Sequence, residues 1–187
     1  IDLGTSAIKV SVVDAQTQKV LASAQYPDQE APIIAKKTGW AEQDPEQWWQ
    51  HVKSAILRVQ ETNLFNPKEI AAIGIAYQMH GLVMLDKNGQ SLRNSIIWCD
   101  SRAVPYGDAA FASIGEEKCL NTLLNSPGNF TASKFAWVKE FEPESYGQTE
   151  KIMLPGDYIA FRLTGDITTT PSALSEGMLW DFKSNSA

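Results

Sequence analysis

The sequence is poor in features that would assign it to several classes of protein. It contains only two cysteines, Cys99 and Cys119, in neither CxxC nor metal-site spacing, which is typical of structural thiols in a reducing compartment. No apolar run approaches the ~20 residues that a membrane span requires, and no basic-then-apolar leader is present. We therefore expect a soluble, cytoplasmic protein.

Basic residues are also scarce. The chain has 16 Lys and Arg against 22 Asp and Glu, a net charge of −6, and no basic cluster that would follow a phosphate backbone. These values exclude nucleic acid as an expected partner. Hydrophobic residues at 43% and charged residues at 20% are ordinary for globular proteins and exclude disordered and fibrous classes.

The length of 187 residues is enough for one domain with a buried core. The chain opens on Ile1, inside an apparent strand, and stops at Ala187 without a closing element. We therefore expect a fragment of a longer protein.

Neither a GxxxxGK[ST] loop nor a GxGxxG turn occurs, which excludes two common ways of holding a nucleotide. The remaining candidate is the opening stretch. Asp2 ends an apolar strand, Gly4 permits a sharp turn, the hydroxyls of Thr5 and Ser6 follow, and Lys9 opens a second strand. Such a turn suits a nucleotide phosphate and Mg²⁺. On these residues alone, an Asp that closes an ordinary tight turn and a solvated Lys9 are equally good interpretations.

The first 76 residues predict a β-β-β-α-β order. Residues 10–13 and 20–26 are β-rich and, with the opening strand, suggest three antiparallel strands. Asp44 and Pro45 predict the start of a helix, whose buried stripe would be Trp48, Val52, Ala55, Ile56 and Val59. Ile70–Ala76 is almost continuously apolar, which predicts a strand covered on both faces.

The rest of the chain alternates strand and helix signals. A hairpin turn is expected at Asn88-Gly89, and a strand at Ser95–Trp98. A helix is expected at 103–124 with a break near Gly115. A second is expected to start at Thr131 or Ser133 as its cap, with Phe135, Val138 and Phe141 facing inward. A strand at Ile152–Leu154 and a helix from Asp157 to Leu163, which Gly165 ends, follow. The predicted fold class is α/β, with a mixed sheet and flanking helices.

A second group of candidate residues, Gln78-Met79-His80-Gly81, follows the apolar strand. Open α/β sheets place ligands at such strand ends. An amide and an imidazole hydrogen-bond hydroxyl groups, Met79 offers an apolar wall, and Gly81 permits close approach. These residues favour a sugar-like pocket, although a lone His in a turn is more often a satisfied structural residue.

The third group, Trp98-Cys99-Asp100-Ser101-Arg102, also follows a predicted strand. We prefer a pairing of Asp100 with Arg102 that pins the loop over direct catalysis by Arg102, because carboxylate and guanidinium form strong paired hydrogen bonds.

These stretches, in this order, resemble the N-terminal domain of the FGGY carbohydrate kinases. The matching segments are the opening turn, Trp40–Pro45 with Trp48-Trp49, Gly74–Ala76 with Gln78–Gly81, Trp98 with Asp100 and Arg102, Thr131–Lys134 and Pro155–Tyr158. The resemblance covers essentially the whole chain. It implies that residues 1–187 form a ribonuclease H-like domain of the actin/hexokinase type, on the sugar-binding side of a cleft.

The resemblance also implies a function. Such kinases use ATP and Mg²⁺ to phosphorylate a sugar hydroxyl, and Met79-His80-Gly81 points to members that convert D-xylulose to D-xylulose 5-phosphate, within xylose metabolism. By resemblance, Asp2 lies by the metal and phosphates and is the catalytic candidate in this chain; Gly4, Thr5, Ser6 and Lys9 lie by the transferred phosphoryl; Gln78, Met79 and His80 contact the sugar; Trp98 and Asp100 line or brace its pocket.

The general base and most adenine contacts of the family lie in a second, nucleotide-binding domain that this chain lacks. Because phosphoryl transfer needs both sides of a cleft, we expect the fragment alone to be inactive. The alternatives are a sister kinase acting on ribulose, gluconate or glycerol, and a non-catalytic sugar- or nucleotide-binding regulator. The expected partners are sugar and ATP, not nucleic acid or membrane. A homodimer is compatible with the sequence, which does not specify oligomeric state or regulation.

Overall fold

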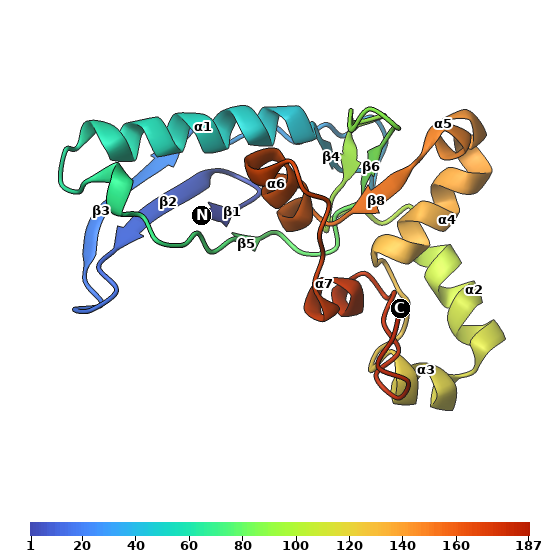
Figure 1. The fold of residues 1–187 in the computed structure, drawn as a ribbon. Coiled ribbons are helices and arrows are strands. Elements are labelled where there is room, and N and C mark those ends of the chain that lie inside the picture. Colours follow the sequence, from blue (N-terminus) through green and yellow to red (C-terminus); the bar gives the residue numbers. More distant parts are fainter. The chain divides into compact units, whose positions relative to one another are not determined.

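The computed structural model describes all of residues 1–187 (Figure 1). Its contacts divide the chain into two compact units. The first unit comprises Ile1–Pro32 and Glu46–Gln78, and the second comprises Ile33–Pro45 and Met79–Ala187. None of the helices combines the length and the apolar character that crossing a bilayer requires.

The first unit contains a mixed four-stranded sheet in the order β3-β2-β1-β5. Its strands are β1 (Asp2–Leu3), β2 (Ile8–Val13), β3 (Val20–Tyr26) and β5 (Ala76–Tyr77). β2 is antiparallel to both β1 and β3, whereas β5 is parallel to β1. The predicted antiparallel start and the mixed sheet are therefore confirmed.

The long helix α1 (Pro45–Glu61) begins where the proline signal predicted it. Four of the five predicted stripe residues are at most 2% exposed, namely Trp48, Val52, Ala55 and Val59, and Ile56 is half-buried. The Arg58 guanidinium donates to the Gln25 carbonyl at 2.9 Å, so α1 runs beside β3. The 3₁₀ turn η1 (Pro67–Glu69) follows.

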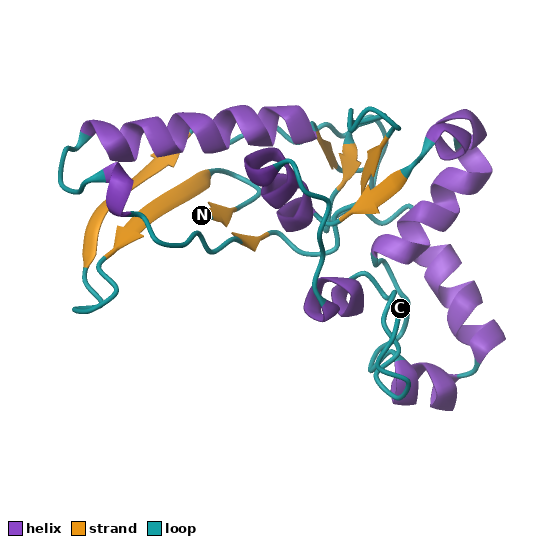
Figure 2. Cartoon of the chain, viewed as in Figure 1, coloured by secondary structure: helices purple, strands orange, loops and turns teal.

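The segment before β5 differs from its prediction. Residues 70–74 are exposed and outside any strand, and regular pairing begins only at Ala76, so the chain that leads into β5 is drawn as a loop (Figure 2). The prediction of a strand covered on both faces over Ile70–Ala76 was wrong. An apolar run becomes a buried strand only where other elements cover it, and residues 70–74 have no such cover here.

The second unit contains two small antiparallel sheets. In one, β4 (Glu42–Gln43) pairs with β7 (Ser95–Ile96), and in the other β6 (Val83–Leu85) pairs with β8 (Lys151–Met153). The predicted hairpin after β6 is confirmed by a bridge between Leu85 and Ser91. The predicted strand over Ser95–Trp98 ends two residues early, at Ile96.

Six helices complete this unit: α2 (Val104–Ile114), α3 (Glu116–Thr122), α4 (Thr131–Phe141), α5 (Pro143–Gln148), α6 (Pro155–Thr164) and α7 (Pro171–Glu176). The break between α2 and α3 lies at Gly115, as predicted, where φ is 94°. The core that joins the sheets to α4 comprises Leu82, Met84, Ile96, Ala103, Trp137 and Val138.

Helix α4 departs from its prediction at both ends. Its N-cap is Phe130, without a side-chain cap; Thr131 donates instead to the Gly81 carbonyl at 3.3 Å and Ser133 to the Pro127 carbonyl at 3.1 Å. Phe141 is 58% exposed rather than inward. It is the last residue of the helix and stacks on Trp137 at 5.0 Å, so its contact is along the helix rather than in the core.

Candidate functional site

The opening turn of the first unit joins β1 to β2. Asp2 and Lys9 are register partners across these strands and both are exposed. Directly opposed residues of antiparallel strands project from the same face of the sheet. At Gly4, an added Cβ would lie 2.8 Å from the Ala7 carbonyl oxygen, closer than normal contact allows. The tight turn therefore requires glycine at this position.

Gln78 lies directly beside this turn. Its backbone N–H donates to the Leu3 carbonyl at 2.8 Å, and its side-chain Oε1 accepts a hydrogen bond from the Thr5 hydroxyl at 3.2 Å. β1 and β5 are parallel neighbours, so the residues that follow them meet at one edge of the sheet. Gln78, expected from the sequence among the sugar contacts, is hydrogen-bonded in the structure to the phosphate candidate Thr5.

The carboxylate of Asp2 is the metal candidate in this turn. No group of three or more His, Cys, Asp or Glu side chains is arranged to hold a metal ion. Mg²⁺ in nucleotide sites commonly keeps several waters and takes one or two carboxylates together with phosphate oxygens. An exposed single carboxylate beside a turn with two hydroxyl groups fits that donor set, in which the nucleotide would supply the remaining oxygens.

His80 occupies a left-handed turn in the second unit, with a φ of 60°. Its backbone N–H donates to the Glu176 carboxylate at 2.5 Å, and its carbonyl accepts from the Lys134 ammonium at 2.6 Å. The ring makes an edge contact with Phe130 at 4.1 Å between centroids. Both backbone polar groups of this one residue are thus held by charged side chains.

The electrostatic surroundings keep the His80 ring neutral at ordinary pH. Burial, together with the positive charge of Lys134, lowers the pKa of His80 below its usual value. Burial also lowers the pKa of the Lys134 ammonium to about 8, against the opposing effect of Asp100. A neutral imidazole has one donor and one acceptor nitrogen, the combination that suits a hydroxyl-bearing ligand.

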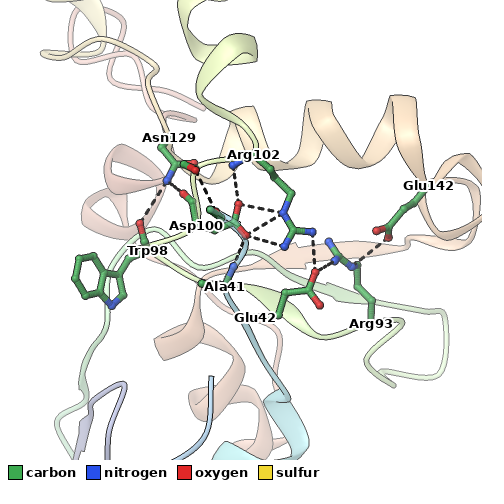
Figure 3. Close-up of polar contacts among 10 residues, drawn as sticks. Ala41, Glu42, Arg93, Trp98, Asp100, Arg102, Asn129 and Glu142 are labelled. Carbon is green, nitrogen blue, oxygen red and sulfur yellow. Dashed lines mark hydrogen bonds and ion pairs between the residues drawn. The ribbon is translucent and has the colours of Figure 1, made fainter. Parts of the chain in front are cut away.

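Asp100 is wholly buried, and its carboxylate is fully engaged (Figure 3). It accepts from the Ala41 backbone N–H at 2.6 Å, from the Arg102 backbone N–H at 2.8 Å, and from Arg102 Nε and Nη2 at 2.6–3.0 Å. The predicted pairing of Asp100 with Arg102 is confirmed. With these contacts, Asp100 braces the loop.

Arg102 extends this arrangement toward β4. Its Nη1 donates to Glu42 Oε1 at 2.7 Å, and Glu42 also accepts from Arg93 at 2.5 Å, which in turn lies 3.2 Å from Glu142. The guanidinium of Arg102 lies 3.7 Å from the centroid of Trp40. A chain of alternating charges therefore ties β4 and the segments on either side of β7 to Glu142, the C-cap of α4 (Figure 3).

Trp98 and Met79 are the exposed members of the second unit's candidates, at 47% and 51% exposure. Asn129 donates from its side-chain amide to the Trp98 carbonyl at 3.3 Å and also to the Asp100 carbonyl. The backbone on either side of Cys99 is thereby fixed, and the indole of Trp98 remains accessible.

The predicted site residues fall into two sets. Asp2, Gly4, Thr5, Ser6, Lys9 and Gln78 lie in the first unit, and Met79, His80, Trp98 and Asp100 lie in the second. Sequence reasoning missed Glu42, Lys134 and Glu176 as supports of the second set. Glu42 and Lys134 lie inside segments that carried the family resemblance, which was the available signal; Glu176 had none.

Comparison with known proteins shows the family of the chain. The family model described as the N-terminal domain of the FGGY family of carbohydrate kinases matches residues 1–186. The xylulose kinase of Bacillus subtilis is 40% identical over 169 residues, which is 90% of this chain and 33% of that protein. The chain therefore spans about a third of that relative's length.

Solved structures of sugar kinases share the fold. A xylulose kinase from Rhodospirillum rubrum superposes with a TM-score of 0.87 at 26% identity, covering 98% of this chain and 38% of that chain. A gluconate kinase from Lactobacillus acidophilus gives a TM-score of 0.85 at 28% identity, with coverages of 97% and 36%. The predicted actin/hexokinase-type α/β fold is confirmed, and the chain belongs to the FGGY family of carbohydrate kinases.

Proposed function

We propose that residues 1–187 are the N-terminal, sugar-binding part of a longer kinase that transfers the γ-phosphoryl of ATP to D-xylulose and yields D-xylulose 5-phosphate. The observation that carries this proposal is the 40% identity to a xylulose kinase over 90% of the chain. The chain covers about a third of that relative. The general base and the adenine contacts are assigned to the remaining part of the full-length kinase.

In this proposal, the opening turn of the first unit binds the phosphate end of the nucleotide. The backbone N–H groups of the turn, including that of Thr5, and the hydroxyl of Ser6 would donate to phosphate oxygens, and Lys9 would add a point charge. Asp2 would hold Mg²⁺, which neutralises charge on the transferred group when bound. The Thr5 hydroxyl donates its one proton to Gln78, and this bond would hold the turn in place.

The second unit would provide the sugar contacts. His80 would form a hydrogen bond with a sugar hydroxyl through the exposed part of its neutral ring, and Met79 and Trp98, both about half exposed, would pack against the apolar face of the sugar. Asp100 would act indirectly, by bracing the loop that presents Trp98. Gln78, which directly precedes Met79 in the sequence, would contact the sugar from the strand end.

A sister kinase acting on gluconate is the second candidate, because a gluconate kinase superposes nearly as well, with a TM-score of 0.85. The deciding experiment is a steady-state profile of the full-length kinase over xylulose, ribulose, gluconate and glycerol. We expect the highest kcat/KM for xylulose, because a few hydrogen bonds in the pocket set such preferences. A clear preference for another sugar would reassign the substrate, and no ATP consumption with any of them would favour a non-catalytic regulator.

The cytoplasm is the location that fits the proposal, since ATP is the phosphoryl donor there and both cysteines are free thiols. We also propose that the full-length kinase forms a homodimer, which light scattering would test by measuring its mass in solution.

A further inference from the structure

Lys134 is a wholly buried ammonium that no catalytic role explains. Its side chain lies on α4 at 0% exposure, so it does not reach a bound ligand. A buried charge is costly unless it is hydrogen-bonded. Its hydrogen-bond acceptor is the carbonyl of His80 at 2.6 Å, a short charge-assisted bond of the strong kind.

Glu176 holds the same residue from the opposite side of its backbone. Its carboxylate accepts from the His80 N–H at 2.5 Å, and the same oxygen lies 3.7 Å from Nδ1 of the His80 ring. Nδ1 itself is shielded from solvent and has no hydrogen-bond partner, although the side chain as a whole is 23% exposed. The exposed part of the ring therefore excludes Nδ1.

The backbone conformation at His80 depends on these contacts. A φ of 60° lies in the left-handed region, which non-glycine residues adopt only when neighbouring contacts favour it. Two charged side chains that come from α4 and α7, far along the chain, supply those contacts. Phe130, immediately before α4, limits ring rotation through its edge contact at 4.1 Å.

We infer that Lys134 and Glu176 are positioning residues that clamp His80 in its left-handed turn and so aim the exposed part of its ring at the sugar. The inference rests on the proposed sugar contact of His80. Neither side chain needs to touch the sugar; both reduce the conformational freedom that sugar binding would otherwise have to remove. If the two residues were purely structural, their replacement would lower the stability of the protein without a specific effect on the KM for the sugar.

The test is a double-mutant cycle in the full-length kinase, with His80→Ala, Lys134→Met and the double variant. The His80→Ala change removes the ring but keeps the carbonyl that Lys134 binds. We expect Lys134→Met alone to raise the xylulose KM several-fold, at most the roughly tenfold rise expected for loss of the His80 ring itself, with the ATP KM nearly unchanged. In the His80→Ala background, the same change should raise the xylulose KM less than about twofold.

Equal effects of Lys134→Met in both backgrounds, or no effect in either, would overturn the clamp. Lys139→Met is the matched control, because Lys139 is an exposed lysine on the same helix. If Lys134→Met does not fold, Glu176→Ala replaces it in the cycle with the same expectations. Glu176→Gln should have a xylulose KM closer to that of the wild type than Glu176→Ala has, because the amide keeps an oxygen that accepts from the His80 N–H. Equal KM values for the two Glu176 variants would count against the clamp.

Hydrogen exchange of the peptide that contains His80 separates this inference from the proposed function. If the wild-type kinase turns over no sugar, the proposed function fails, and exchange still measures the clamp. We expect Lys134→Met, but not Lys139→Met, to speed exchange at this peptide roughly tenfold, since the turn would open more often. Unchanged exchange would overturn the clamp.

Discussion

Arg102 Nη2 lies 2.6 Å from Asp100 Oδ2, and neither side chain is more than 1% exposed. This pair belongs to the core of the second unit, where Trp40 and Trp137 flank the guanidinium at 3.7 and 4.9 Å from their ring centroids. A buried charge pair is costly to break, because each ion is left without the partner that replaces its water.

We therefore predict that Asp100→Asn lowers the free energy of unfolding by about 3 kcal/mol, measured by denaturant unfolding followed through tryptophan fluorescence. Asp28→Asn is the matched control, because Asp28 pairs with Arg58 at 2.6 Å while 75% exposed. That change should have little effect, since water screens exposed pairs. Equal destabilisation by the two variants would show that burial of the Asp100 pair does not matter.

Asp2→Asn tests the proposed metal role. Asp2 is exposed, so the fold should be intact, while turnover by the full-length kinase should fall roughly a hundredfold, because a metal ion supplies several kcal/mol of charge stabilisation. Asp108→Asn, an exposed change on α2, is the control for loss of one negative charge. Near-normal turnover at ordinary Mg²⁺ concentrations would remove Asp2 from the metal site.

His80→Ala tests the proposed sugar contact. We predict a roughly tenfold rise in the xylulose KM with a smaller change in kcat, because a lost neutral hydrogen bond weakens binding by about one such factor. Steady-state kinetics of the full-length kinase measures both constants. An unchanged KM would mean that His80 is a structural turn residue.

Residues 1–187 alone should show no measurable sugar-dependent ATP hydrolysis or transfer. Phosphoryl transfer relies on positioning and charge neutralisation from both sides of the reacting groups, and the chain covers 33% of its Bacillus subtilis relative. A coupled assay with xylulose and ATP measures this. Robust turnover by this chain would contradict the assignment of the general base to the remaining part of the kinase.

The lowered pKa of Lys134 predicts a pH dependence of stability. Its pKa is about 8 in the folded chain and 10.5 ordinarily, so between these values the unfolded chain binds a proton that the folded chain has released. Stability rises with pH wherever the unfolded state binds more protons.

The free energy of unfolding of the wild type, relative to Lys134→Met, should therefore rise between about pH 8 and 10.5 and stay level outside that range. Denaturant unfolding at several pH values measures this difference. A constant difference across the range would mean that the pKa of Lys134 is not lowered by folding.

Local signals predicted the elements whose formation depends on neighbouring residues. The proline at position 45 and the apolar spacing of α1 predicted its start and its buried face, because helical periodicity is set by residues three and four apart. Gly115 and Gly165 were read correctly as helix ends, where φ is 94° and 82°, since glycine adopts such angles without strain.

Signals that depend on distant partners were less reliable. Ile70–Ala76 has the composition of a buried strand, yet residues 70–74 lie exposed, because composition does not specify whether a neighbour covers the chain. Phe141 was expected inward because it is apolar and lies at helical spacing from Val138. It is exposed because it lies in the last turn of α4.

By itself, the sequence determined the family and the residues of the opening turn, because these depend on motifs whose residues are close in the chain. It also predicted the mixed sheet from the order of its elements, although the pairing of β5 with β1 joins distant residues. The tertiary structure alone decided that Gln78 joins Thr5, that Asp100 accepts from the Ala41 N–H, and that Lys134 and Glu176 both hold His80. These contacts join residues at least 54 positions apart, and only folding brings such partners within hydrogen-bond distance.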